Sequence, residues 1–263
     1  MLVLIRGAGD LASGVSLRLH RAGFPVVMTD LPKPTAIRRT VCFSQAIRFG
    51  TTMVEDAEGV CCHTAREVKA ALDAKKIPVL PDETAKCKDW LHPDVLVDGI
   101  LAKKNLGTKM SDAPLVIALG PGFCAGRDCH AVIETMRGHT LGRVLYEGSP
   151  LPNAGVPGVI AGYAAERVLR APADGVFEPK KEIGAQVKKG EVAAVVSGKP
   201  MLCKIDGCLR GLMQAGAVVF EGMKCGDVDP RGIPDNCTTA SDKAIAVGGG
   251  VLEAVLHFTH ALD

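Results

Sequence analysis

The sequence is poor in aromatic residues and carries no large excess of either charge. Phe, Trp and Tyr make up 4% of the 263 residues, and the formal net charge is +2. Proteins that bind nucleic acid use clustered cations and aromatic stacking platforms, so this composition argues against a nucleic-acid partner. The same small charge gives no electrostatic reason to expect binding to an acidic membrane surface.

Long apolar runs and paired cysteine motifs are also missing. No run is long enough to span a bilayer, and the apolar start over residues 1–5 is too short for a signal peptide, so we expect a cytoplasmic protein without a membrane partner. The ten cysteines contain no C-x-x-C pair. We therefore expect reduced thiols, most of them buried as small hydrophobic residues, and no metal site.

What the chain does have is a β-α-β pattern at its start. Residues 2–5 are apolar and predict a buried strand, residues 11–22 have helical spacing, and residues 24–30 predict a second strand that ends on Asp30. A carboxylate at that position is placed to accept hydrogen bonds from a ribose hydroxyl.

Three glycines, Gly7, Gly9 and Gly14, lie at the corner between the first strand and the helix. Glycine lets main-chain N–H groups approach an anion closely at the positive end of a helix dipole, so these residues, with Asp10 among them, predict a phosphate-binding turn. The G-x-G-x-x-x-x-G spacing and the negative charge of Asp10 leave open a turn that only packs helix against strand.

Adjacent Arg38 and Arg39 follow the second strand after a proline-rich loop. Two guanidinium groups at this point are suited to hold a 2′-phosphate or another anion. A solvated basic turn explains them equally well.

Further polar and glycine residues follow the later strands. Asp98 ends a strand over residues 95–98, and Gly120 and Gly122 follow the apolar strand at 115–119. In open α/β sheets ligands bind beyond the carboxyl ends of the strands, so we expect these residues to share a cleft with the first glycine turn.

His130 and Glu134 have the i, i+4 spacing of a helical acid–base or metal pair. The β-branched residues between them and the Arg-Gly turn that follows favour a hairpin, which would place the two about 13 Å apart on one strand. One metal ion cannot hold both at that distance. We keep His130 and Asp98 as candidate proton-handling residues.

Local signals also mark the ends of two helices. Thr64 and Glu67 form a capping box before an amphipathic helix, and Ser241 is placed to cap a last helix. Gly248–Gly250 lie inside that last helix, where we expect them to allow close packing.

An internal repeat with a 32-residue offset occupies the second half of the chain. Asp174-Gly175 recurs as Asp206-Gly207, and Gly184, Val187 and Gly190 recur as Gly216, Val219 and Gly222. This segment resembles biotinyl and lipoyl carrier domains, the barrel-sandwich hybrid. The modified lysine motif of those carriers is missing at Lys199, so we expect a structural or docking β-domain.

Together these patterns predict an α/β protein: a Rossmann-like parallel-sheet domain, a small pseudo-symmetric all-β domain of biotinyl or lipoyl type, and a C-terminal helix. The expected boundaries are residues 1–150 for the first, 165–232 for the second, and 233–263 for a helical segment that packs back.

Six stretches resemble one family, the accessory proteins of selenium-dependent molybdenum hydroxylases known as the YqeB family. They are residues 5–14, 18–23, 36–41, 119–123, 137–139 and 226–232, in order along nearly the whole chain. The N-terminal half is also distantly similar to the Rossmann part of XdhC-type chaperones.

The resemblance implies a maturation factor that handles the molybdenum cofactor, or a nucleotide-linked form of it, in a cleft of the first domain. Its partners would be hydroxylases of the xanthine dehydrogenase type and other maturation proteins. Two alternatives stay open: an NAD(P)-dependent oxidoreductase, and a partner-docking scaffold without a ligand of its own. Whether the chain catalyses a reaction is also open.

Overall fold

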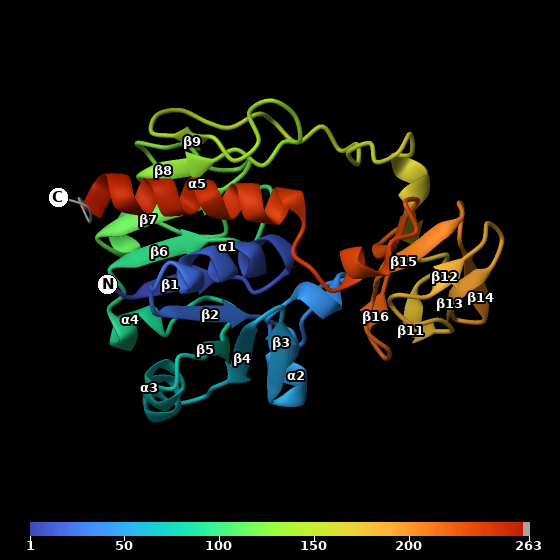
Figure 1. Cartoon of the computed structure of the whole chain (residues 1–263), viewed down its shortest axis with the longest axis horizontal. Helices are drawn as coiled ribbons and strands as arrows, with labels where there is room; N and C mark the ends of the chain where they lie inside the picture. The colour runs from blue at the N-terminus through green and yellow to red at the C-terminus, as the bar shows by residue number, and fades with distance from the viewer. Residues whose placement is uncertain (260–263) are drawn as a thin grey trace. The chain divides into compact units, whose positions relative to one another are not determined.

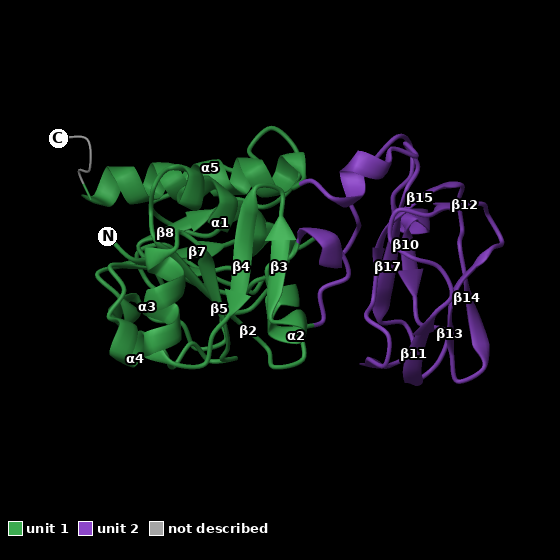
Figure 2. Ribbon diagram, turned by 60° about the horizontal axis from the view of Figure 1, so that its bottom comes forward, with its two compact units in different colours: residues 1–34, 42–154, 240–263 green, residues 35–41, 155–239 purple. Residues whose placement is uncertain are grey.

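The computed structural model describes residues 1–259, and its chain divides into two compact units (Figures 1 and 2). Unit 1 contains residues 1–34 and 42–154 and the chain from residue 240 onward, whereas unit 2 contains residues 35–41 and 155–239. The boundaries therefore differ from those expected. The segment 35–41 belongs with unit 2, and the segment 233–263 is divided between the units, with residues 260–263 lying outside the described part.

Unit 1 is built on one large sheet. Its strands are β1 (Val3–Arg6), β2 (Val26–Asp30), β3 (Thr51–Val54), β4 (Ala57–Cys61), β5 (Ile77–Pro81), β6 (Val95–Asp98), β7 (Leu115–Leu119), β8 (Ala131–Ile133) and β9 (Val144–Leu145). Its helices are α1 (Asp10–Arg21), α2 (Gln45–Phe49), α3 (Ala65–Asp73), α4 (Lys88–Leu91) and α5 (Asp242–Thr259), with a 3₁₀ turn η2 at Met110–Asp112.

The nine strands lie in the order β3-β4-β5-β2-β1-β6-β7-β8-β9. The seven from β4 to β8 are mutually parallel, whereas β3 and β9 pair antiparallel at the two edges. Buried aliphatic residues on both faces explain why the central strands are parallel and covered by helices. The antiparallel β8–β9 pair confirms the hairpin interpretation of the residues around His130.

Helices α1 and α5 pack against each other on one side of this sheet, while α3 and α4 lie on the other (Figures 1 and 2). A Cβ on Gly14 would lie 2.9 Å from the main chain of Ala244, and one on Gly248 would lie 2.8 Å from Arg18. The contacts advance in the same direction along both helices, so α1 and α5 run parallel. The expectation that the glycines of α5 serve close packing is confirmed for Gly248 and Gly250, whereas a Cβ on Gly249 would meet no neighbouring atom within 4 Å.

Unit 2 consists of two antiparallel sheets. Its strands are β10 (Val168–Arg170), β11 (Gly175–Pro179), β12 (Gln186–Val187), β13 (Val192–Val196), β14 (Lys199–Leu202), β15 (Gly207–Leu212), β16 (Val218–Val219) and β17 (Lys224–Asp229). Short 3₁₀ turns complete the chain: η1 at Arg39–Val41 and η3 at Ala165–Arg167, with η4 at Pro234–Cys237.

The repeat governs the architecture of unit 2. Strands β11, β12 and β13 recur as β15, β16 and β17, each starting 32 residues later. The same shift places β10 within β14. Replacing each strand by its repeat partner therefore converts the order β10-β17-β15-β12 of one sheet into the order β14-β13-β11-β16 of the other. The unit therefore has internal pseudo-two-fold symmetry, and the 32-residue periodicity is confirmed in its strands.

The fold class expected from the sequence is nevertheless wrong as stated. The first unit has a nine-stranded mixed sheet and not a Rossmann-like parallel one. The final helix α5 belongs to that first unit, and the second unit is a pair of four-stranded antiparallel sheets. Among residues 1–259, no helix is both long and apolar enough to cross a membrane.

Candidate functional site

The chain turns in opposite directions after two neighbouring strands, β1 and β6. The connection from β1 leads to β2 on one side, and the connection from β6 leads to β7 on the other. In open sheets, the crevice beyond the carboxyl ends of such a strand pair is the usual place for a ligand. Arg6 and Asp98, the last residues of the two strands, lie directly opposite each other in the register.

The glycine turn after β1 packs closely against the neighbouring turn at Gly7 and has free space beside Gly9. Gly7 has φ +107°, and a Cβ there would lie 2.9 Å from the main chain of Gly99 in the turn after β6. Gly9, the N-cap of α1, has no atom within 4 Å of the place where its Cβ would lie. The first glycine thus brings two turns together, while the space beside the second is unfilled by protein.

Asp30 lies at the end of β2, and its carboxylate faces the glycine turn. One oxygen accepts a hydrogen bond of 2.8 Å from the main-chain amide of Ala8, and the other accepts one of 2.7 Å from Leu31. Burial raises the pKa of Asp30, and these two hydrogen bonds oppose that rise. The carboxylate therefore orders the turn, which differs from the ribose-binding role expected of it.

Gly14 has a packing role, which differs from the phosphate contact expected. It lies inside α1, where the close approach of Ala244 leaves no room for a side chain. Because α1 and α5 are parallel, this contact brings the N-termini of both helices to the carboxyl edge of the sheet. Two positive helix-dipole ends therefore lie near each other.

The two helix starts are capped differently. The hydroxyl of Ser241 accepts a hydrogen bond of 3.2 Å from the amide of Ala244, which confirms the expected cap of α5. No side chain caps the start of α1, although Asp10 contributes a carboxylate to its first turn. The first N–H groups of a helix have no acceptor within the helix, so the start of α1 can donate hydrogen bonds to a ligand.

Lys243, in the first turn of α5, brings a positive charge to the same edge. Among the described residues its ammonium group makes no hydrogen bond or ion pair. Burial is the main cause that lowers the pKa of Lys243, followed by the charge of Arg137, whereas the carboxylates of Asp10 and Glu134 oppose the decrease. The ammonium group therefore lies near these charges, and the two carboxylates do not fully offset the cost of burying it.

The neighbouring charges at this edge are held by the protein itself. Arg137 donates hydrogen bonds of 2.8 and 3.0 Å to Asp242, and buried Glu134 accepts bonds from the amides of Met136 and Leu151. These interactions keep both groups in place around Lys243.

Gly120 and Gly122 follow β7 at the same carboxyl edge as the first glycine turn. Both have positive φ, and a Cβ on Gly122 would lie 2.6 Å from the main chain of Lys104. The loop they support contains two non-glycine residues in the left-handed region, Leu101 (φ 61°) and Lys103 (φ 62°). Such backbone strain is concentrated at functional sites, and here it holds the loop that carries the Lys103 charge.

Asp98 is almost completely buried, with 2% of its surface exposed. Its carboxylate accepts a hydrogen bond of 2.6 Å from Thr108 and lies 3.5 Å from Arg6. Burial raises the pKa of Asp98, while the Thr108 hydroxyl and the Arg6 charge oppose that rise. The residue fixes the arginine and the loop after β6, which is a positioning role.

His130 lies away from these residues, near the amino end of β7. Its Nδ1 accepts a hydrogen bond of 3.0 Å from the amide of Val116, two residues before the Ala118 that faces Asp98 in the sheet register. Its ring also packs edge-to-face on Phe258, with centroids 6.1 Å apart. The two candidate proton-handling residues, His130 and Asp98, therefore lie at different places along the sheet.

Arg38 and Arg39 belong to unit 2. Leu212 donates its amide to the carbonyl of Ile37, which fixes the segment beside β15. Arg38 donates to the carbonyls of Asn236 and Thr239, and Arg39 donates at 2.8 Å to the carbonyl of Leu212. Both guanidinium groups thus stabilise unit 2, which corrects their expected role as counter-charges at the glycine turn.

All ten cysteines are free, and eight of them are buried, as expected. Burial raises the pKa of the Cys129 thiol to about 12, which keeps this group protonated and unreactive. Among residues 1–259, no group of three or more His, Cys, Asp or Glu side chains is arranged to hold a metal ion.

Sequence reasoning missed the cations of this edge: Lys243, Lys103 and Arg137. Arg137 was visible only as part of an Arg-Gly turn, and Lys243 follows Ser241-Asp242, which indicated a helix cap and nothing more. No local pattern connects residues 103, 137 and 243, because they lie far apart in the sequence.

No protein-family model matches the chain. Among curated proteins it is similar to the Escherichia coli K12 protein named "Uncharacterized protein YqeB", with 49% identity over 259 residues. The match covers 98% of this chain and 48% of that protein, so the chain spans about half the length of the curated relative it matches.

Solved structures give only weak similarities. An aspartoacylase family protein from Mesorhizobium loti aligns with 86% of this chain and 83% of its own, at 12% identity and a TM-score of 0.27. A succinylglutamate desuccinylase/aspartoacylase from Rhodobacter sphaeroides aligns with 86% of this chain and 84% of its own, at 17% identity and the same TM-score. Scores this low support no conclusion about fold or chemistry.

Proposed function

We propose that unit 1 binds the phosphate group of a cofactor at the carboxyl edge of its sheet, and that the chain is an accessory protein in the maturation of selenium-dependent molybdenum hydroxylases. The cofactor would be the molybdenum cofactor or a nucleotide-linked form of it. The maturation role rests on the resemblance of six stretches of the sequence to that family. The binding role rests on the geometry of the edge.

The observation that carries the binding role is the convergence of two parallel helix N-termini on one incompletely compensated lysine. Helix α1 starts without a side-chain cap, the space beside Gly9 is open, and Lys243 of α5 makes no ion pair among the described residues. A phosphate group there would accept hydrogen bonds from main-chain amides and neutralise the ammonium. The carboxylate of Asp10, in the first turn of α1, reduces the net positive charge at this edge of the sheet.

The structure gives less support to the NAD(P)-dependent oxidoreductase. That role needs an acidic side chain at the end of β2 to bind a ribose, whereas both oxygens of Asp30 already accept main-chain amides. The phosphate-binding role makes no such demand on Asp30.

One observation favours partner docking by unit 2 as a second role. Val176 of β11 pairs with Val218 of β16, and their side chains, like that of nearby Phe220, are largely exposed. Exposed apolar clusters mark interaction surfaces, and a hydroxylase of the xanthine dehydrogenase type would be the partner. Val218→Lys in the full chain should abolish capture of that partner and leave the melting temperature unchanged. Capture that survives this change would remove the surface from consideration.

The maturation role is tested by the pterin content of the purified chain. We propose that the protein is cytoplasmic. Wild type and Gly9→Val would be purified without oxygen from cells that make the molybdenum cofactor. The pterin released from each protein would then be oxidised and measured by its fluorescence. Wild type should carry pterin, and Gly9→Val should carry at least about tenfold less. Equal pterin in both, or none in either, would reject the proposal.

A further inference from the structure

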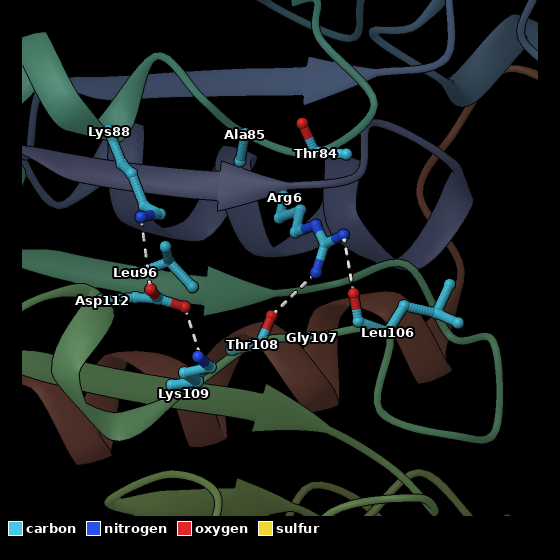
Figure 3. Close-up of a pocket in the computed structure, with 10 residues that line it drawn as sticks. All are labelled: Arg6, Thr84, Ala85, Lys88, Leu96, Leu106, Gly107, Thr108, Lys109 and Asp112. Carbon is cyan, nitrogen blue, oxygen red and sulfur yellow. Dashed lines mark hydrogen bonds and ion pairs between the residues drawn. The ribbon is translucent and has the colours of Figure 1, made fainter.

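A cavity of about 260 Å³ opens in unit 1 on the side of the sheet opposite α5, between α4 and the loop that follows β6 (Figure 3). This volume is close to that of nine water molecules at roughly 30 Å³ each, so it suits a compound with few heavy atoms. The cavity is separated from the glycine turn, because Arg6 faces it from the end of β1 while α1 begins on the other side of the sheet.

The cavity contains a buried cation with unused hydrogen-bond donors. Arg6 is 7% exposed and donates to the hydroxyl of Thr108 at 2.9 Å and to the carbonyl of Leu106 at 3.2 Å. Its Nε has no hydrogen-bond partner among the described residues. An arginine has five N–H donors, and the two hydrogen bonds to Thr108 and Leu106 use two of them, so the guanidinium can donate further hydrogen bonds to a ligand oxygen.

Cations outnumber carboxylates among the residues that line the cavity. Arg6, Lys88 and Lys109 carry positive charge, whereas Asp112 is the lining carboxylate. Lys88 lies 3.3 Å from Asp112, and Asp98 lies behind the cavity 3.5 Å from Arg6. Lys88 also lies 3.2 Å from Asp89. These three carboxylates offset most of the positive charge around the cavity, so an anion with one negative charge fits it better than a dianion.

The rest of the wall can contact carbon. Leu96 of β6 and Ala85 are buried and line the cavity beside the arginine. A planar guanidinium next to an apolar wall is suited to a carboxylate attached to a short hydrocarbon or ring.

We propose that this cavity binds a small organic monocarboxylate, with its carboxylate against the guanidinium of Arg6 and its carbon skeleton against Leu96 and Ala85. The site is independent of the phosphate site proposed above, since it uses none of the same side chains. A failure of one does not imply a failure of the other.

The test is calorimetric titration of the full chain with propionate, butyrate and benzoate, with neutral benzamide and inorganic phosphate as comparison ligands. Trp90, the single tryptophan, lies on α4 with Lys88 and gives a second signal by fluorescence. At least one carboxylate should bind with a Kd in the millimolar range or tighter, and benzamide should not bind detectably.

Two variants locate the binding. Arg6→Gln removes the charge and should weaken carboxylate binding by at least about tenfold. Leu96→Phe enlarges a side chain of the cavity wall and should abolish binding, and its melting temperature shows whether the chain stays folded, so the test survives if the arginine variant does not fold. Lys69→Gln, which removes an exposed lysine of α3, should leave the Kd unchanged.

Several results would overturn the proposal. They are the absence of binding by any carboxylate up to about 10 mM, or carboxylate binding that Leu96→Phe leaves intact. Phosphate binding that is tighter than that of every carboxylate and is lost in Leu96→Phe would overturn the assigned ligand class.

Discussion

Asp30 accepts a hydrogen bond from the amide of Ala8, so the acid at the end of β2 supports the glycine turn from within. This contact separates two accounts of the edge. If Asp30 only orders the turn, its charge is dispensable, because an asparagine oxygen can accept the bond from Ala8, although the asparagine NH2 group cannot accept the one from Leu31. If it binds a ribose, the charge and both oxygens matter.

We therefore predict that Asp30→Asn keeps the fold and does not weaken phosphate binding. Burial raises the pKa of Asp30 above its unfolded value of 3.8, so the ionised form costs stability, and this cost appears as the pH rises through the interval above 3.8. The variant avoids this cost but loses one of the two amide hydrogen bonds, so at neutral pH it should melt close to the temperature of wild type. Loss of dinucleotide binding in the variant would instead favour the oxidoreductase role.

Gly9→Val and Gly14→Val form a matched pair of substitutions in one turn and its helix. Gly9 has φ −77° and ψ −172° with free space beside it, so valine fits the backbone and occupies the place proposed for the anion. Gly14 faces Ala244, so valine there overpacks the α1–α5 contact. We predict that the first loses ligand with an unchanged melting temperature, and that the second loses about 1–3 kcal/mol of stability.

Thermal denaturation and ligand titration on both variants check this pair. A large fall in the melting temperature of Gly9→Val would show that its space is needed by the protein. Normal stability of Gly14→Val would contradict the close packing of the two helices.

Lys243→Met should abolish phosphate binding and stabilise the chain. Burial, followed by the charge of Arg137, lowers the pKa of Lys243 below its unfolded value of 10.5. The charged lysine therefore costs stability at neutral pH, and this cost disappears only as the pH rises above its folded pKa. We expect a higher melting temperature at pH 7 together with at least about tenfold weaker phosphate binding.

The exposed Lys69, in an i, i+4 pair with Asp73, provides the control for Lys243. Lys69→Met should change neither the phosphate affinity nor the melting temperature appreciably. A lower melting temperature for Lys243→Met would mean that the lysine stabilises the fold, and would argue against a ligand-binding role.

Unit 2 depends on a buried charge network. Asp227 accepts hydrogen bonds of 2.8 Å from Arg167 and from Arg210, and all three side chains are buried. Asp227→Asn removes the carboxylate that these two buried cations share, although Asp229 still lies 3.4 Å from Arg210, and should cost about 3–5 kcal/mol in denaturant unfolding. Asp206→Asn, an exposed carboxylate of the same unit, should cost less than about 1 kcal/mol. Equal effects would show that burial of the network is unimportant.

The same network predicts the acid stability of unit 2. Burial raises the pKa of Asp229, but hydrogen bonds from Arg231 and the charge of Arg210 outweigh it and lower the pKa from 3.8 to about 2. The stability from this group is complete above the unfolded pKa and is lost as the pH falls through the folded one. Circular dichroism of the wild type should show this stability decrease between pH 3.8 and about 2. An equally stable unit 2 at the lower pH would contradict the prediction.

Elements defined by local signals were predictable from sequence. The Thr64 hydroxyl accepts the Glu67 amide in the expected capping box, Ser241 caps α5, and the 32-residue repeat sets the strands of unit 2. Each of these depends on residues close in the chain or on a periodicity visible without coordinates.

Features that depend on distant contacts were not predictable. Arg38 and Arg39 lie in unit 2 because Ile37 bonds with Leu212, 175 positions away in a strand of the repeat. Lys243 reaches the edge only because Gly14 lets α5 approach α1. No periodicity or motif encodes either contact. The site residues that returning segments contribute were therefore missed. Arg38 and Arg39 were expected at the glycine turn, whereas they make their hydrogen bonds within unit 2.

The central claim is that the edge beside Gly9 binds a phosphate group. Its most direct test is calorimetric titration of pyrophosphate into wild type and Gly9→Val under identical conditions. The account predicts measurable binding by wild type and at least about tenfold weaker binding by the variant, with equal melting temperatures. Equal affinities in the two proteins would contradict it.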